Sequence, residues 1–348
     1  MTSVARDRVA VVGAGAWGTA LADLLANSGC EVRLWAREPE VVESFRDRGE
    51  NSPYLGDVSL NRGLAVTNSL GTALADTGVL VWACPVQYSA ALLADAAPLI
   101  PPGAIVVSAS KGIEVATLRR MDEIFAGVIP AGQARRLCVL SGPSFAREVA
   151  ARMPTAVVVA SRDQESRRRV QALFQTDRFR VYRNPDVVGV ELGGALKNVI
   201  ALAAGVAAGL ELGHNTVAAL MTRGLAEISR LGVAMGARHA TFAGLAGMGD
   251  LVLTCTGGLS RNRTVGVRLG RGETMKEIMA EARTVAEGVA TVHAVHDLAR
   301  RLGVEMPVSA EVYRIVAEGL DPMEALHRLM TREPTSEHPA TPVSGEGS

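Results

Sequence analysis

Hydrophobic residues in the first half of the chain gather in short runs, and polar segments separate these runs. The runs predict buried β-strands, because they are too short for helices and are rich in β-branched residues. They occupy residues 8–13, 31–37, 64–67, 78–83, 104–108, 137–140 and 155–160. Helical spacing lies between them, around residues 87–97, 118–125 and 144–150. Alternating strands and helices are typical of an α/β fold with a doubly wound parallel sheet.

From residue 187 onward the hydrophobic spacing changes to the period of helices. Helices are predicted around Lys197 and at residues 215–235, 274–280, 289–302, 309–318 and 323–330. We therefore expect a sheet domain over residues 1–186 and a mainly α-helical C-terminal domain over residues 187–332. The tail at 333–348 is rich in Pro, Ser, Glu and Gly, which predicts disorder.

A glycine-rich turn follows the first apolar run. Gly13, Gly15 and Gly18 have the G-x-G-x-x-G spacing, after a predicted strand and before a helical pattern. This is the fingerprint of a Rossmann-type dinucleotide-binding domain. The glycines let the backbone approach a pyrophosphate, and N–H groups at the helix start hold its charge. A glycine-rich turn without a ligand is the alternative.

The end of the second predicted strand bears on the choice of cofactor. A carboxylate at this place bonds the ribose hydroxyls of NAD, whereas an arginine accommodates the 2′-phosphate of NADP. Arg37 and Glu38 stand side by side here. The pair leaves NAD(H) open and slightly favours NADP(H), unless Arg37 is only a solvated charge at a strand end.

One lysine breaks the pattern of an apolar helix. Lys197 lies among Ala, Leu and Val, and lysine is rarely buried without a partner or a task. Gly193 and Gly194 lie one helical turn away, so we expect open space beside the ammonium group, as in a cleft. The alternatives are a lysine that reaches solvent, or one that pairs with Glu191 or Asp250.

Polar loops accompany this lysine. Lys111 follows the strand at 104–108, and the Ser-Gly-Pro-Ser segment at 141–144 follows the next strand. Because ligands bind at the carboxyl ends of such strands, both loops predict a polar rim for an anionic substrate. In the helical half, Arg261 lies in a Gly-Gly-Leu-Ser-Arg-Asn segment, where its guanidinium suits a phosphate. Plain or solvated turns are the alternatives.

Composition excludes several classes of protein. Lys and Arg together number 36, as do Asp and Glu, so no global charge favours nucleic acid or an anionic membrane. The four cysteines lack CxxC or His spacing, which argues against a disulfide framework and a metal site and favours a reducing cytoplasm. We find no signal-peptide core, and the longest apolar run is too short for a membrane span.

Several long motifs, in order along nearly the whole chain, resemble the bacterial NAD(P)-dependent glycerol-3-phosphate dehydrogenases. They are GAGAWGTALA at 13–22, SKGIE at 110–114, LSGPSFAREVA at 140–150, ELGGALKNVIALAAG at 191–205, AGMGDLVLTCTGGLSRNRTVG at 246–266 and VAEGVATV at 285–292. The resemblance implies an oxidoreductase that interconverts sn-glycerol 3-phosphate and dihydroxyacetone phosphate with NAD(P)H. Its main product would be glycerol phosphate for phospholipid synthesis.

The resemblance also implies a role for each matching residue. Lys197 is the implied catalytic lysine, and Lys111 is shared by substrate and cofactor. The other implied substrate contacts are Gly142, Ser144, Asn198, Asp250, Thr254, Ser260, Arg261 and Asn262. The expected cofactor contacts, with those of the glycine turn included, are Gly13, Gly15, Ala16, Trp17, Gly18, Arg37, Ala146, Arg261, Val285 and Glu287. The loop at 51–57 lacks the family's proline after Tyr-Leu, which leaves its conformation open.

The implied reaction needs a proton for the carbonyl oxygen of the substrate. We expect protonated Lys197 to donate it, with a pKa lowered by burial and by Lys111, and Asp250 restraining that shift. Two other functions stay open: a hydroxyacid or 6-phosphogluconate type of dehydrogenase, and a non-catalytic nucleotide-binding sensor. The apolar helices are compatible with a homodimer, and feedback regulation is left open.

Overall fold

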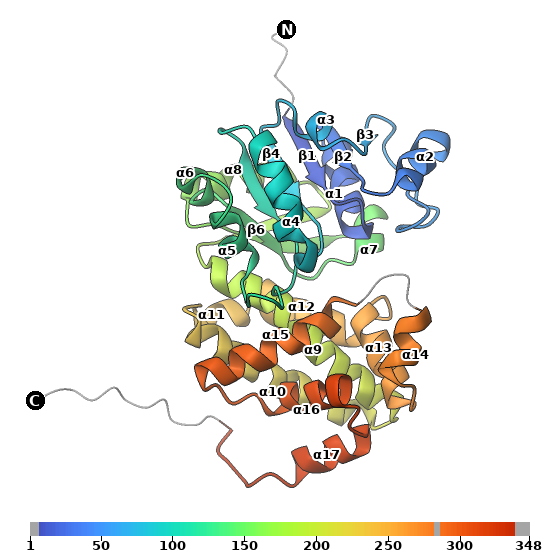
Figure 1. Ribbon diagram of the computed structural model, residues 1–348, viewed down its shortest axis with the longest axis vertical. Coiled ribbons are helices and arrows are strands. Elements are labelled where there is room, and N and C mark those ends of the chain that lie inside the picture. The colour runs from blue at the N-terminus through green and yellow to red at the C-terminus, as the bar shows by residue number, and fades with distance from the viewer. Residues whose placement is uncertain (1–6, 282–285, 338–348) are drawn as a thin grey trace, which may run out of the picture.

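One sheet of eight strands forms the N-terminal half of the molecule (Figure 1). The computed structural model describes residues 7–281 and 286–337. Across the sheet the strands are β3 (Ala65–Thr67), β2 (Glu31–Trp35), β1 (Arg8–Val12), β4 (Val79–Trp82), β5 (Ile105–Ser108), β6 (Cys138–Ser141), β7 (Thr155–Ala160) and β8 (Phe179–Asn184). Neighbours pair in parallel except β6 and β7, which are antiparallel. The predicted α/β fold is confirmed, with one antiparallel pair added.

Helices cover both faces of this sheet. They are α1 (Ala16–Asn27), α2 (Pro39–Arg48), α3 (Leu70–Leu74), α4 (Val86–Ala96), α5 (Met121–Ala126), α6 (Ala131–Ala134), α7 (Ala146–Ala150) and α8 (Gln164–Phe174). Val9 and Val11 of β1 join a core with α1 and α8, whereas Ala10 and Val12 join a second core with α4 and α5. Burial on both faces explains why the central strands read as continuous apolar runs.

The C-terminal half is a group of helices around α9. They are α9 (Val187–Gly209), α10 (Gly213–Ala234), α11 (His239–Phe242), α12 (Asp250–Thr256), α13 (Arg261–Gly270), α14 (Met275–Glu281), α15 (Glu287–Leu302), α16 (Pro307–Tyr313) and α17 (Pro322–Met330). Helix α9 packs against α10, α12, α13, α15 and α16. It is long and apolar enough to cross a membrane, but 94% of its most apolar window is buried inside the fold. We therefore interpret α9 as a core helix.

Helices α9 and α13 cross with their backbones in direct contact. A Cβ atom at Gly205 would lie 2.2 Å from the carbonyl oxygen of Arg263, and one at Gly266 would lie 2.2 Å from that of Leu202. One turn further along, Gly209 and Gly270 repeat this arrangement. Any larger residue would force the two helices apart, so the start of α13 has a fixed place beside α9.

Several elements were missed by the hydrophobic pattern. Helix α8 is mostly polar and buries few apolar side chains, among them Val170 and Phe174, so its periodicity is weak. Strand β8 alternates buried and exposed residues in a segment assigned to a domain junction. The segment at 244–263, expected to lie between helices, contains α12 and the start of α13. Helices α2, α3, α6 and α11 were not predicted either. The tail at 333–337 has no helix or strand, and residues 338–348 lie outside the described residues.

Candidate active site

The glycine turn between β1 and α1 has the geometry that a dinucleotide requires. Gly13 has φ +110°, and a Cβ there would lie 2.9 Å from the Cys84 Sγ atom. A Cβ at Gly18 would lie 1.9 Å from the carbonyl oxygen of Gly13. Gly15 instead faces open space, and no described side chain caps α1. Helix α1 therefore offers N–H groups to a diphosphate. The indole Nε1 of Trp17 is buried and has no hydrogen-bond partner among the described residues.

Asn51 supports this turn, a role that the sequence pattern did not predict. Its buried Nδ2 donates to the carbonyl oxygen of Ala14 (2.8 Å) and to Thr19 Oγ1 (2.7 Å). These bonds tie the 51–57 loop to the glycine turn and hold the Ala14 carbonyl in place. An asparagine in a polar loop carries no periodic signal, so only the structure reveals this contact.

Arg37 and Glu38 lie at the carboxyl end of β2, as expected for the cofactor's adenosine end. The Arg37 side chain is 72% exposed, and its Nη2 lies 2.9 Å from Glu38 Oε1. The hydrogen bond to Glu38 raises the pKa of Arg37. The pair uses Arg37 Nε and Nη2 and one Glu38 oxygen, so the largely exposed guanidinium remains accessible to a cofactor phosphate. The preference for NADP(H) thus stays a prediction.

A buried lysine and carboxylate form the centre of the site, where the helices meet the sheet domain. Lys197 Nζ donates to Asp250 Oδ1 (2.5 Å) and to Thr254 Oγ1 (2.7 Å). Lys111 Nζ donates to the other Asp250 oxygen, Oδ2 (2.8 Å). Lys197 is 6% exposed and Asp250 1%. Of the alternatives for Lys197, the structure therefore shows the pair with Asp250.

The surroundings of Lys197 shift its pKa toward neutral pH. Burial lowers the pKa of Lys197 to about 8, Asp250 opposes this shift, and the second ammonium group at Lys111 adds to it. A group with a pKa near the working pH can both donate and accept a proton. The cluster thus has the properties of a general acid and base.

The expectation of open space beside Lys197 was wrong. A Cβ at Gly193 would lie 2.4 Å from the carbonyl oxygen of Ala246, and one at Gly194 would lie 2.7 Å from Ser141 Oγ. The glycines therefore admit neighbouring atoms instead of leaving a gap. They let the turn that precedes α12 and the end of β6 approach α9, which brings Asp250 within reach of Lys197.

The loops that follow β5 and β6 are in contact, as expected from their places at the carboxyl ends of neighbouring strands. Gly142, with φ +132°, accepts a hydrogen bond from Lys111 Nζ (3.3 Å) and one from Ser144 Oγ (2.9 Å) through its carbonyl oxygen. Ala146 begins α7 directly behind them. Lys111, Gly142 and Ser144 thus form one polar edge next to Asp250.

The start of α13 packs against α9, the helix that carries Lys197. Ser260 caps this helix, because its Oγ accepts the backbone N–H of Arg263 (3.2 Å). Asn262 Oδ1 accepts the N–H of Gly288 (2.9 Å), and a Cβ at Gly288 would lie 2.9 Å from the carbonyl oxygen of the buried Asn198. The exposed Arg261 side chain stands at the first position of α13.

Glu287 interacts electrostatically with the cations of the site. Burial raises the pKa of Glu287, and the charges of Arg261, Lys111 and Lys197 oppose that shift. The carboxylate therefore lies near all three cations of the site. Val285, the other cofactor contact implied at this place, lies outside the described residues.

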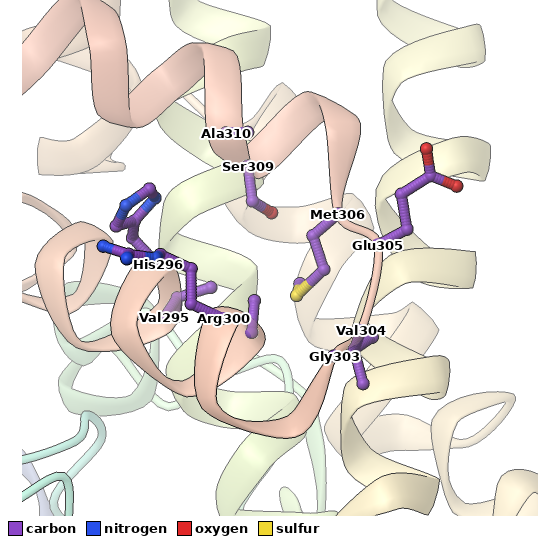
Figure 2. Close-up of a pocket in the computed structure, with 10 residues that line it drawn as sticks. Val295, His296, Arg300, Gly303, Val304, Glu305, Met306, Ser309 and Ala310 are labelled. Carbon is purple, nitrogen blue, oxygen red and sulfur yellow. The ribbon is translucent and has the colours of Figure 1, made fainter.

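A separate cavity of about 310 Å³ lies between the end of α15 and the start of α16 (Figure 2). His296, Met306 and Ser309 are among the side chains that line it. None of the predicted site residues in the described part of the chain lines it. This cavity is not part of the candidate active site.

A dinucleotide-binding turn, together with a buried lysine whose pKa is lowered to about 8, is typical of a dinucleotide-dependent dehydrogenase. Two family models match the chain. The N-terminal model of NAD-dependent glycerol-3-phosphate dehydrogenase matches residues 8–167, and the C-terminal model matches residues 186–327. The chain belongs to this family, and the resemblance seen in the sequence is confirmed.

Relatives agree with this assignment over the full length. The glycerol-3-phosphate dehydrogenase [NAD(P)+] of Geobacter metallireducens is 57% identical over 95% of this chain and 99% of its own. The crystal structure of glycerol-3-phosphate dehydrogenase from Coxiella burnetii has a TM-score of 0.89 at 38% identity, covering 94% of this chain and 99% of that one. The enzyme from Saccharomyces cerevisiae has a TM-score of 0.79 at 27% identity, with 92% and 99% covered.

Proposed function

We propose that this protein is a glycerol-3-phosphate dehydrogenase that reduces dihydroxyacetone phosphate to sn-glycerol 3-phosphate with NAD(P)H. The product would enter phospholipid synthesis. The observation that carries the proposal is the buried Lys197 with its pKa lowered to about 8, next to Asp250 and Lys111. A dinucleotide-binding sensor would have no use for such a proton donor.

The bound cofactor would supply the hydride, and the protein supplies the proton and the orientation. Protonated Lys197 polarises the substrate carbonyl and delivers its proton to the carbonyl oxygen. In the reverse direction neutral Lys197 takes the proton from the hydroxyl group. Asp250 and Thr254 hold the Lys197 ammonium in one orientation through their hydrogen bonds.

The two sides of the site would bind the two ends of the substrate. Arg261, at the start of α13, is the phosphate ligand, because a guanidinium offers a bidentate fork and the helix start adds positive potential. Ser260 and Asn262 complete this end. Lys111, Gly142 and Ser144 form the opposite rim, and Asn198 closes the pocket beside Lys197. With both ends held, the carbonyl has a fixed place.

The remaining assignments follow from the position of each element. β8 ends at Asn184 and α9 begins at Val187, which supports a dinucleotide-binding domain over 1–186 and a catalytic domain over 187–332. Arg37 slightly favours NADP(H). We propose a cytoplasmic protein, and exposed apolar side chains on the helical half, such as Met330 at 76%, are compatible with a homodimer.

Steady-state reduction of dihydroxyacetone phosphate by the purified protein, with NADPH and with NADH, tests the reaction. Turnover with either cofactor supports the proposal, and the ratio of the two kcat/KM values reports on Arg37 and Glu38. Absence of turnover in protein that binds the cofactor would favour a sensor. Turnover of a hydroxyacid or of 6-phosphogluconate instead would favour the other dehydrogenases.

Lys197→Ala tests the catalytic role. We expect turnover to fall by about 10²-fold to 10⁴-fold, the usual contribution of a general acid, with cofactor affinity unchanged. Stopped-flow or steady-state rates and cofactor titration by fluorescence measure the two quantities. Near-normal turnover would remove Lys197 from the mechanism.

A further inference from the structure

A second buried charge cluster lies outside the active site, between α9 and the sheet domain. Glu191, near the start of α9, accepts the backbone N–H of Asp122 through Oε1 (3.0 Å). Its Oε2 lies 3.4 Å from Arg120 Nε. Arg120 Nη2 lies 3.0 Å from Asp122 Oδ1, and Arg162 Nη2 lies 2.9 Å from Asp122 Oδ2. Arg120 Nη2 also lies 3.3 Å from Oε1 of the exposed Glu123. Two cations and three carboxyl groups thus join three separate segments of the chain.

Stability alone does not explain this cluster. The side chains of Arg120, Asp122 and Glu191 are 8%, 4% and 5% exposed, so these groups have lost most of their hydration. Burial, together with the neighbouring Asp122, raises the pKa of Glu191 well above its usual value. Burying charges costs nearly as much free energy as their attraction returns, and apolar residues often serve stability better. Buried ionic groups can instead fix one arrangement of the parts they join.

The cluster lies at one end of a connection whose other end reaches the active site. The segment at 109–120 joins β5 to α5; Lys111 is near its beginning and Arg120 is its last residue. Lys111 is linked to α9 through Asp250, which also binds Lys197. Arg120 is linked to α9 directly, through Glu191. Both ends of the segment are therefore held to the same helix, about two helical turns apart.

We propose that Glu191 is a positioning residue of the reaction, which sets the placement of the sheet domain on α9. The sheet domain carries the glycine turn and α9 carries Lys197, so their relative placement fixes how the cofactor edge meets the proton donor. Among the described residues, no hydrogen bond or ion pair joins Glu191 to a proposed substrate or cofactor contact, so Glu191 acts through Arg120 and the backbone of Asp122. The inference rests on the proposed function.

Glu191→Gln keeps the acceptor for the Asp122 N–H but replaces Oε2, the oxygen that faces Arg120, with an amide nitrogen that cannot accept a hydrogen bond. We expect kcat for dihydroxyacetone phosphate reduction to fall on the order of 100-fold, because a misplacement near 1 Å has that effect. Cofactor Kd and substrate KM should stay within about threefold, since neither binding surface changes. A readout independent of turnover is hydrogen–deuterium exchange of the apo protein, which should speed up at residues 113–123 and 187–193.

Glu227→Gln is the matched control. Glu227 is a carboxylate 2% exposed on α10 that accepts the N–H groups of Val308 and Ser309, so it anchors α16 within the helical half. We expect this variant to lower the melting temperature while kcat stays near that of the wild type. An equal loss of kcat in both variants would overturn the positioning role.

A double variant separates positioning from a general loss of structure. If Glu191 acts through Arg120, the kcat of Glu191→Gln/Arg120→Gln should be close to that of Glu191→Gln alone. Multiplied losses in the double variant, or unchanged kcat and exchange in Glu191→Gln, would overturn the inference. If the wild type itself fails to turn over dihydroxyacetone phosphate, the proposed function fails, and the exchange measurement still tests whether Glu191 holds the interface.

Discussion

Replacement of Asp250 by asparagine tests the electrostatics of the site most directly. Asp250 is 1% exposed and binds Lys197 and Lys111 at once. Asparagine keeps its shape and volume but offers a single neutral acceptor oxygen. Two ammonium groups would then face each other without the carboxylate that binds both of them. We expect this change to act on the protonation of Lys197 more than on the fold.

The size of the effect follows from the distances. At an effective dielectric constant of about 20, a charge pair at about 4 Å is worth on the order of 4 kcal/mol, and the pair in this site is closer. One pH unit corresponds to about 1.4 kcal/mol, so losing Asp250 should move the titration of Lys197 down by about two to three pH units. Lys197, whose pKa is about 8 in the wild type, would then be mostly neutral at pH 7.5.

The pH dependence of kcat is the assay. Reduction of the ketone uses the protonated lysine, so its rate falls as pH rises through the lysine's pKa. The wild type should lose activity above about pH 8. Asp250→Asn should already be about 100-fold slower at pH 7.5 and should recover as the pH falls toward about 5.5. Asp297→Asn, on the exposed side of α15, is the control and should follow the wild type.

Two results would refute this reasoning. If the alkaline fall of kcat stays at the same pH in Asp250→Asn, then Asp250 does not set the protonation of Lys197. If kcat drops equally at every pH while the melting temperature holds, Asp250 acts on the substrate itself.

Two further predictions concern the phosphate end and the helix crossing. Arg261→Ala should raise the KM for dihydroxyacetone phosphate by about 10-fold to 100-fold, because a charged hydrogen bond is worth about 1.5–3 kcal/mol. Arg268→Ala, on the same helix but paired with Glu273, is its control, and an unchanged KM in Arg261→Ala would contradict the assignment. Gly266→Ala should lower the melting temperature by roughly 5–10 °C, since the added Cβ meets the Leu202 carbonyl and overpacking costs about 1–3 kcal/mol. Gly132→Ala, where nothing lies within 4 Å of the added Cβ, should leave the melting temperature unchanged, and equal shifts in the two variants would refute the account.

Sequence patterns predict those features that depend on residues close together in the chain. The order of strands and helices, the glycine turn and the unusual Lys197 all follow from local spacing. Helix α8 and strand β8 were not predicted because they have few apolar positions, and tertiary packing decides their structure. The same limit applies to the region around Asp250, where the sequence pattern did not predict helix α12.

Contacts between residues far apart in the sequence were harder to predict. Spacing singled out Lys197 but left Glu191, Asp250 and solvent open as its surroundings. Asp250 is 53 positions away along the chain, so only the fold decides between them. Asn51 and the Glu191–Arg120 contact had no local signal at all, because each depends on a contact across tens of residues. The roles implied by the family resemblance remain predictions for the experiments above.

The backbone contact between α9 and α13 bears on substrate length. Gly205, Gly209, Gly266 and Gly270 leave no layer of side chains between the two helices that could adjust by changing rotamer. The backbones that carry Lys197 and Arg261, the proposed phosphate ligand, thus stand at a spacing set by the main chain. The distance from the bound phosphate to the proton donor would then be fixed. A longer substrate, such as a four-carbon phosphate, would place its carbonyl out of line with Lys197. Discrimination by chain length would then reside in glycines that never touch the substrate.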